Sequence, residues 1–151
     1  MTTMRSNAWM LLLLLLTGCA SPGATVVGQG DVDKLYQREW ELQSIVVDGE
    51  PDIMHVDAKM TINFGPGGQV AGFAAVNRYA GTYKLGPDGK LAWGALGVVG
   101  ERRKGPPELM DKEHKFLEAL RKVNMLILGR HALIMQRDDG STALSFTEAG
   151  F

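Results

Sequence analysis

The side chains that most often do chemistry in proteins are few in this sequence, and their spacing does not favour catalysis. The three histidines are His55, His114 and His131, and none lies in an HExxH pattern or a comparable spacing for a metal ion. A site that brings all three together in the folded chain stays open as an alternative, because neighbours in space need not be neighbours in sequence. We therefore expect no metal and no cofactor.

Serine nucleophiles and paired carboxylates give no stronger signal. The serines that fall on or beside expected strands are Ser44, Ser141 and Ser145. None of them belongs to a GxSxG elbow or an SxxK motif. Asp138 and Asp139 could form an acid–base pair or part of a cation site, but Gly140 follows them, and Asp-Gly sequences favour a hairpin turn because they supply positive φ angles. The sequence therefore predicts a protein that is not an enzyme.

Two polar clusters are candidate binding sites. Asn77, Arg78 and Tyr79 are consecutive and could present hydrogen-bond donors to a ligand or partner. The structural interpretation, which we favour, is an asparagine bonded to its own backbone at a strand end and a packed tyrosine whose hydroxyl reaches a partner. Arg102 and Arg103 could contact anionic lipid headgroups, although a solvated loop is the simpler interpretation.

The N-terminal residues carry the clearest signal in the chain. Arg5 precedes an apolar stretch of nine residues, 8–16. This stretch is too short for a transmembrane helix, which needs about 20 residues, and typical of a secretory signal. Leu16-Thr17-Gly18-Cys19 follows and resembles the bacterial lipobox, in which the cysteine sulfur is acylated and the signal is cleaved before it. We predict a lipoprotein signal peptide over residues 1–18 and lipid attachment at Cys19, with an unmodified cysteine after an ordinary signal as the alternative.

The residues after this cysteine indicate how the protein is placed. Residues 19–34 are predicted to be a lipidated N-terminus and flexible tether, because most of them are small, polar or glycine. Ala20 rather than aspartate follows the cysteine, which in such lipoproteins implies sorting to the outer membrane. The expected partner is therefore the membrane, which the protein reaches through palmitate-type acyl chains. We expect the domain of residues 35–151 to lie just off the headgroups, and we favour the periplasmic face over the cell surface.

Composition limits the remaining possibilities. The chain has 151 residues, of which 45% are hydrophobic and 22% charged, and these values are typical of one globular domain. The formal net charge of −1 gives no electrostatic footprint for nucleic acid. One cysteine excludes an internal disulfide.

Hydrophobic residues alternate with period 2 along the first part of this domain, which is typical of half-buried strands. The strands expected there cover residues 40–47, 60–64, 70–75, 83–85 and 91–93. The period becomes helical over residues 106–123, where prolines stand at the start and acids precede bases by four positions. Further strands are expected at residues 125–128, 132–135 and 143–146. This pattern predicts an α+β fold with a mainly antiparallel sheet.

Three segments together resemble the META or HslJ-like domain of bacterial envelope proteins. They are Trp40-x-Leu42, the run from Gly72 to Tyr83, and Gly105-Pro106-Pro107-Glu108-Leu109-Met110 leading to Leu120. The resemblance covers about residues 35 to 149. It implies a mainly antiparallel sheet curled into an incomplete β-barrel with one helix packed on it. It also implies a role in envelope stress, heat shock or antibiotic tolerance, with no established reaction.

The sequence departs from the family at two places. Ala75-Val76-Asn77 stands where members usually have Gly-Cys-Asn, and the polar segment 101–105 replaces one that often contains a methionine and a cysteine. A thiol-based role is therefore excluded here.

We expect a non-enzymatic envelope lipoprotein that binds or stabilises an envelope partner. The alternative is a carrier or chaperone that holds an apolar or acyl ligand between sheet and helix. Its lining would include Trp40, Phe64, Trp93 and Phe116, although plain core packing is the favoured role for these four.

Overall fold

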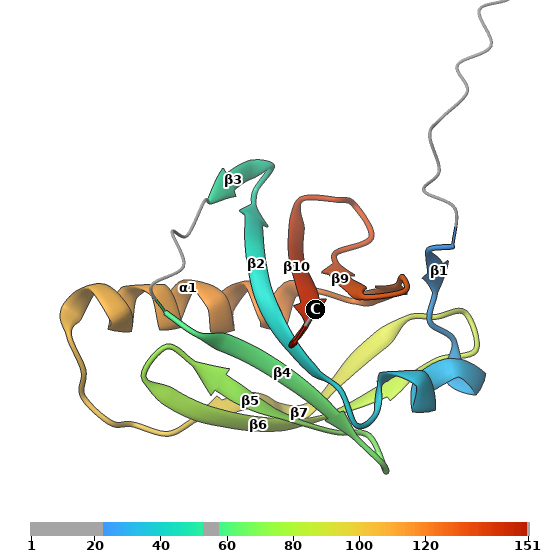
Figure 1. The fold of residues 1–151 in the computed structure, drawn as a ribbon, viewed down its shortest axis with the longest axis horizontal. Coiled ribbons are helices and arrows are strands. Elements are labelled where there is room, and N and C mark those ends of the chain that lie inside the picture. The colour runs from blue at the N-terminus through green and yellow to red at the C-terminus, as the bar shows by residue number, and fades with distance from the viewer. Residues whose placement is uncertain (1–22, 53–57, 151) are drawn as a thin grey trace, which may run out of the picture.

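The computed structural model describes residues 23–52 and 58–150. The predicted signal peptide, Cys19 and His55 lie outside the described residues. Within them, ten strands form one antiparallel sheet that is accompanied by one α-helix and one 3-10 helix (Figure 1). The order of neighbouring strands is β1-β8-β9-β10-β2-β4-β5-β6-β7, and the short β3 pairs with β2.

Every expected strand is present, but the strands expected at residues 83–85 and 91–93 are longer than predicted. The strands before the α-helix are β1 (Thr25–Val26), β2 (Glu39–Val47), β3 (Glu50–Asp52), β4 (Met60–Gly65), β5 (Gln69–Ala74), β6 (Asn77–Leu85) and β7 (Leu91–Gly100). The strands after it are β8 (Met125–Leu128), β9 (Ala132–Gln136) and β10 (Thr142–Glu148). The 3-10 helix η1 covers Gln29–Leu35 and the α-helix α1 covers Pro107–Lys122. The helix therefore lies where its period and its proline start predicted it.

The sheet curls until β7 and β8 meet at one end only. Lys90 and Met125 form an isolated antiparallel bridge there, and the Leu91 N–H donates to the Asn124 carbonyl at 2.7 Å. Along the rest of the gap α1 covers the open side of the sheet (Figure 1). The Arg121 guanidinium donates to the Val98 carbonyl of β7 at 3.0 Å. The fold is therefore an incomplete antiparallel barrel with one helix packed on it, as expected.

The core lies between the inner face of the sheet and α1. Period 2 in the strands and the helical period in α1 bring their apolar side chains to this one interior. Trp40 and Phe116 are fully buried, Phe64 is 3% exposed, and Trp93 is half-buried with its indole N–H bonded to the Val123 carbonyl at 3.2 Å. These four side chains pack in or against the core, which is the role that the sequence favoured for them.

The predicted tether is shorter than the sequence indicated. Residues 19–34 were expected to be flexible, but β1 pairs with β8 from Thr25 onwards, and residues 29–35 form η1. Val27 is 1% exposed and Leu35 is fully buried. The prediction of a tether that continues to residue 34 was wrong. A two-residue strand among glycines shows no periodicity in the sequence. Burial of the Val27 and Leu35 side chains holds this segment on the domain.

Candidate functional site

Asn77, the first residue of β6, lies inside the molecule and joins three segments. Its side-chain Nδ2 donates to Glu113 Oε1 at 2.8 Å and to the Arg103 carbonyl at 3.1 Å, and its Oδ1 accepts from the Arg103 N–H at 2.8 Å. The backbone N–H of Asn77 donates to Glu113 Oε2 at 2.8 Å. Asn77 is 1% exposed and Glu113 is 6% exposed. The asparagine thus fixes helix and loop to the sheet instead of bonding its own backbone, and it does not face a partner.

Tyr79 is also an interior residue. Its hydroxyl donates to the Thr61 carbonyl of β4 at 2.6 Å, and its ring lies 5.7 Å from the ring of Phe116, edge to face. Burial raises the pKa of the Tyr79 hydroxyl far above its usual value, so it does not act as an acid or base at neutral pH. Tyr79 therefore has the structural role that the sequence favoured, whereas the structural role of Asn77 comes from its bonds to Glu113 and Arg103 and not from a bond to its own backbone.

Arg78 points the other way, because successive side chains of a strand alternate between the two faces of a sheet. It is exposed on the outer face of β4–β7, and no described residue forms an ion pair with its guanidinium. A hollow of about 820 Å³ opens beside it. Its lining includes Phe73, Arg78 and Val99 together with the ion pair between Lys59 and Glu39, at 2.7 Å.

A second hollow of about 760 Å³ lies on the same face, and the two share a row of side chains. The strand register places this row straight across the sheet, one residue from each of β4, β5, β6 and β7: Asn63, Ala71, Ala80 and Val99. The two alanines form the floor because a methyl group cannot fill the space above a strand. We call this depression the outer groove.

The outer groove is apolar for a surface feature. Val99 belongs to the row that the two hollows share, and it is 56% exposed. Leu96 lines the second hollow and is 85% exposed. They are two of the three large hydrophobic side chains that are exposed among residues 23–52 and 58–150. Apolar side chains gathered on one exposed face mark a contact surface more often than isolated ones do.

The groove was not predicted from the sequence, because it depends on the register between neighbouring strands. An alanine at an outward strand position is unremarkable by itself. Only the pairing of Ala71 with Ala80, and of Ala80 with Val99, brings the small and apolar side chains into one row. The sequence signal that indicates the groove is the lack of charge at three outward strand positions, Ala71, Ala80 and Val99.

The basic loop lies at the rim of this region. Arg102 and Arg103 are exposed, and Arg103 Nε lies 3.3 Å from Glu101 Oε2. The backbone of Arg103, rather than its side chain, holds the loop on Asn77. The departure from the family pattern at 101–105 therefore leaves the loop anchored, with its cations in solvent.

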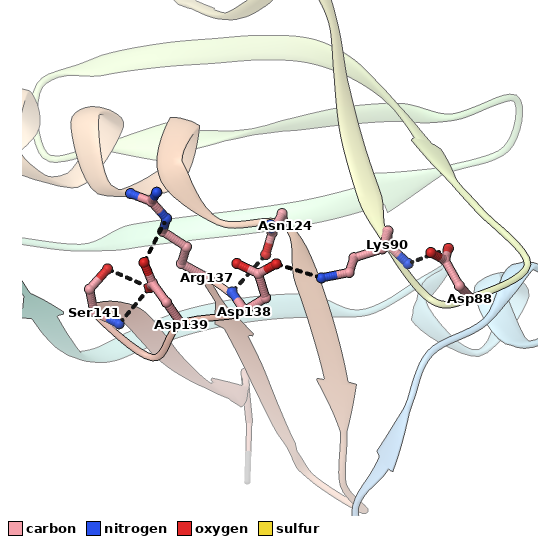
Figure 2. A network of polar contacts seen from close by, with 7 residues as sticks. All are labelled: Asp88, Lys90, Asn124, Arg137, Asp138, Asp139 and Ser141. Atoms are coloured by element: carbon pink, nitrogen blue, oxygen red, sulfur yellow. Dashed lines mark hydrogen bonds and ion pairs between the residues drawn. The ribbon is translucent and has the colours of Figure 1, made fainter.

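Asp138 and Asp139 bind different partners in the turn between β9 and β10 (Figure 2). Lys90 Nζ lies 2.7 Å from Asp138 Oδ2 and, with Asn124, holds the pKa of Asp138 below its usual value. The Ser141 hydroxyl donates to Asp139 Oδ1 at 2.6 Å and lowers the pKa of that carboxyl. Carboxyls kept ionised in this way are unsuited to general acid work near neutral pH. The predicted hairpin turn is confirmed, with Gly140 at φ +74°.

The remaining histidines offer no metal centre. His114 Nε2 lies 3.9 Å from Glu118 on the solvent side of α1, and His131 Nδ1 lies 3.3 Å from Glu148 Oε2 of β10. Within residues 23–52 and 58–150, no three histidine, cysteine or acidic side chains are grouped to hold a metal ion. Neither helix among these residues has the length and apolar character to cross a bilayer.

An incomplete antiparallel barrel with one packed helix and a groove on its outer face defines the structural class of this domain. The family comparison names the class. The model of the META domain matches residues 33–150, so the chain belongs to the META domain family.

Solved structures agree on the fold. An NMR structure of a protein from Burkholderia xenovorans superposes with a TM-score of 0.64 at 23% identity, covering 81% of this chain and 88% of the other. The crystal structure of a DUF4847-family protein from Bacteroides vulgatus gives a TM-score of 0.57 at 15% identity, covering 77% and 96%. At these identities the likeness shows the fold alone. Among curated proteins none matches the chain.

Proposed function

We propose that this protein is a lipid-anchored envelope protein that binds a partner through the outer groove and catalyses no reaction. The observation that carries the binding role is the row of small and apolar side chains across β4–β7, with Val99 exposed in its floor. Free sheet faces normally carry polar side chains, so an apolar depression on one is costly unless something covers it.

The anchoring half of the proposal rests on the N-terminal sequence. The apolar stretch 8–16 and the lipobox-like Leu16-Thr17-Gly18-Cys19 favour export and acylation. Two or more acyl chains give stable attachment, where one chain gives only marginal binding. We place the protein at the outer membrane, facing the periplasm, with a role in the envelope stress response or antibiotic tolerance.

A carrier of an acyl ligand is the second candidate, and we propose the outer groove as its site in place of the space between sheet and helix. The space between sheet and helix holds the packed side chains of Trp40, Phe64 and Phe116. The outer groove instead offers an apolar floor, with the Arg78 guanidinium at one end to meet a carboxylate or phosphate. Its ligand would be an anionic amphiphile that lies along the surface.

Site-specific photo-crosslinking in intact cells tests the proposal. A photoreactive residue at Ala80, exposed in the floor of the groove, should give a discrete crosslinked product. The matched control is the same residue at Gln43, which is exposed on β2 and lines neither hollow. Identical products from both positions would overturn the binding role of the groove.

Titration with a fluorescent fatty acid separates the two candidates. Saturable binding that is weakened in Arg78→Gln supports the carrier. No binding, together with a protein crosslink at Ala80, supports a protein partner.

A further inference from the structure

We infer that the surface where the chain leaves the domain rests on the anionic headgroups of the membrane that holds Cys19. We call this the exit surface, and it consists of Thr25, Lys34, Arg38, Gly129 and Arg130. The inference rests on the proposed acylation of Cys19 and goes beyond it, because it states which face of the domain meets the lipid.

The chain is fixed to the domain from β1 onwards. Thr25 pairs with Leu128 of β8, and the Val27 N–H donates to the Leu126 carbonyl at 2.8 Å. Val27 is 1% exposed, so its side chain belongs to the core. Any pull on the N-terminus therefore acts at this edge of the sheet.

The stretch between the acylation site and this edge is short. Six peptide units separate Cys19 from Thr25. Fully extended they span about 21 Å, since each residue adds about 3.5 Å. A domain of this size is about 35 Å across. The exit surface must therefore stay near the headgroups, while the opposite end of the molecule cannot reach them.

The exit surface has the chemistry of a headgroup site. A hollow of about 460 Å³ opens where the described chain begins. Its lining consists of Gly23, Thr25, Lys34, Arg38, Leu128, Gly129 and Arg130. These residues include three cations and no acid, and Arg130 is exposed with no ionic partner among the described residues. Lipid phosphates are bound by such groups of lysine and arginine.

The acids nearby stand at the margin of this hollow. Lys34 Nζ lies 2.6 Å from Asp31 Oδ1, and Arg38 lies 3.5 Å from Glu148, which His131 also contacts. None of these acids lines the hollow. A phosphate that enters it therefore meets cations first. Arg38 is also held in place by Trp40, whose ring centroid lies 5.7 Å from its guanidinium carbon.

Fluorescence quenching in vesicles tests this orientation. The acylated protein is reconstituted into vesicles of phosphatidylethanolamine and phosphatidylglycerol that contain a phospholipid with a nitroxide on its headgroup. One variant, Ala132→Cys, carries a fluorophore at an exposed position three residues from Gly129. The matched control, Glu108→Cys, carries it in the first turn of α1, at the opposite end of the long axis from β1 (Figure 1). Acylation blocks Cys19, so each variant takes one label.

Quenching at Ala132→Cys should exceed quenching at Glu108→Cys severalfold, because headgroup nitroxides act only near contact. A flexible Gly-Ser insertion after Ala20 should reduce this difference without abolishing it, because it releases the tether while Lys34, Arg38 and Arg130 still meet the headgroups. Equal quenching at both positions in the protein without the insertion would overturn the inference. A specific protein crosslink from residue 132 in envelopes, without quenching in vesicles, would assign the exit surface to a protein partner.

The intact mass of the same sample distinguishes a failure of the proposed orientation from a failure of the proposed anchoring. Acyl chains on Cys19 with equal quenching would refute the orientation alone. An unmodified Cys19 would refute both.

Discussion

Replacement of Asn77 by alanine should destabilise the domain by about 3–4 kcal/mol. Two hydrogen bonds join its amide to the backbone of Arg103, and each contributes about 1 kcal/mol. A third reaches the buried carboxylate of Glu113 and contributes about 2 kcal/mol, because bonds to charged groups are stronger. After the change, the backbone N–H of residue 77 is the one donor that this carboxylate keeps within residues 23–52 and 58–150.

Thermal unfolding followed by tryptophan fluorescence measures this effect, since Trp40 and Trp93 lie in and against the core. The melting temperature should fall by roughly 10–15 °C. Arg78→Ala is the matched control, because Arg78 is adjacent and exposed, and its effect should stay within about 0.5 kcal/mol. Equal melting temperatures for the two variants would refute the role assigned to Asn77.

A donor swap makes the test sharper. Asn77→Asp places a second carboxylate against Glu113 in a buried site, so at neutral pH it should be more destabilising than alanine. Adding Glu113→Gln to that variant restores one donor between the two side chains. Part of the stability should then return, with a coupling of about 1–3 kcal/mol in the double-mutant cycle. Additive effects would show that Asn77 and Glu113 do not act together.

Three further changes test other parts of the structure. Burial raises the pKa values of Tyr79 and Tyr83. The stability that these two residues contribute is therefore present below the ordinary tyrosine pKa and is lost as pH rises above it. In an alkaline absorbance titration, the two phenols should ionise only as the chain unfolds. Gly72→Ala should destabilise strongly, because the new Cβ would lie 2.0 Å from a carbonyl of β4 and 2.6 Å from the Tyr79 hydroxyl; unchanged urea unfolding would contradict that packing. Lys90→Met removes the contact that lowers the pKa of Asp138, whose contribution to stability is present above the pKa of the unfolded carboxyl and is lost in acid. Because both side chains are about half exposed, the melting temperature should fall only slightly at low salt and not at all at high salt.

Much of the fold could be predicted from local patterns. The alternation of Met60, Ile62 and Phe64 predicted β4, and the prolines before Glu108 predicted the start of α1. These signals suffice because each element shows its own period along the chain.

The missing parts depend on contacts between distant segments. The pattern predicted only residues 91–93 of β7, because Gly94 and Gly97 interrupt its alternation, yet pairing with β6 carries the strand to Gly100. β1 exists because β8 offers an unpaired edge. Glu113 stands 36 positions after Asn77, so no local spacing could have linked them.

The candidate site divides in the same way. The sequence singled out Asn77, Arg78 and Tyr79 together, and strand alternation separates them. Two of the side chains point into the core and only Arg78 reaches the outer face. The exposed member lies beside the groove, while the groove itself needs the register of four strands.

The proposed role depends most directly on the chemical state of residue 19. Intact-mass and peptide mass spectrometry of protein extracted from cell membranes measures it. We predict a mature chain that begins at Cys19 and carries two or three acyl chains, recovered only with detergent. A chain with a free thiol at this position, released from cells without detergent, would contradict the account.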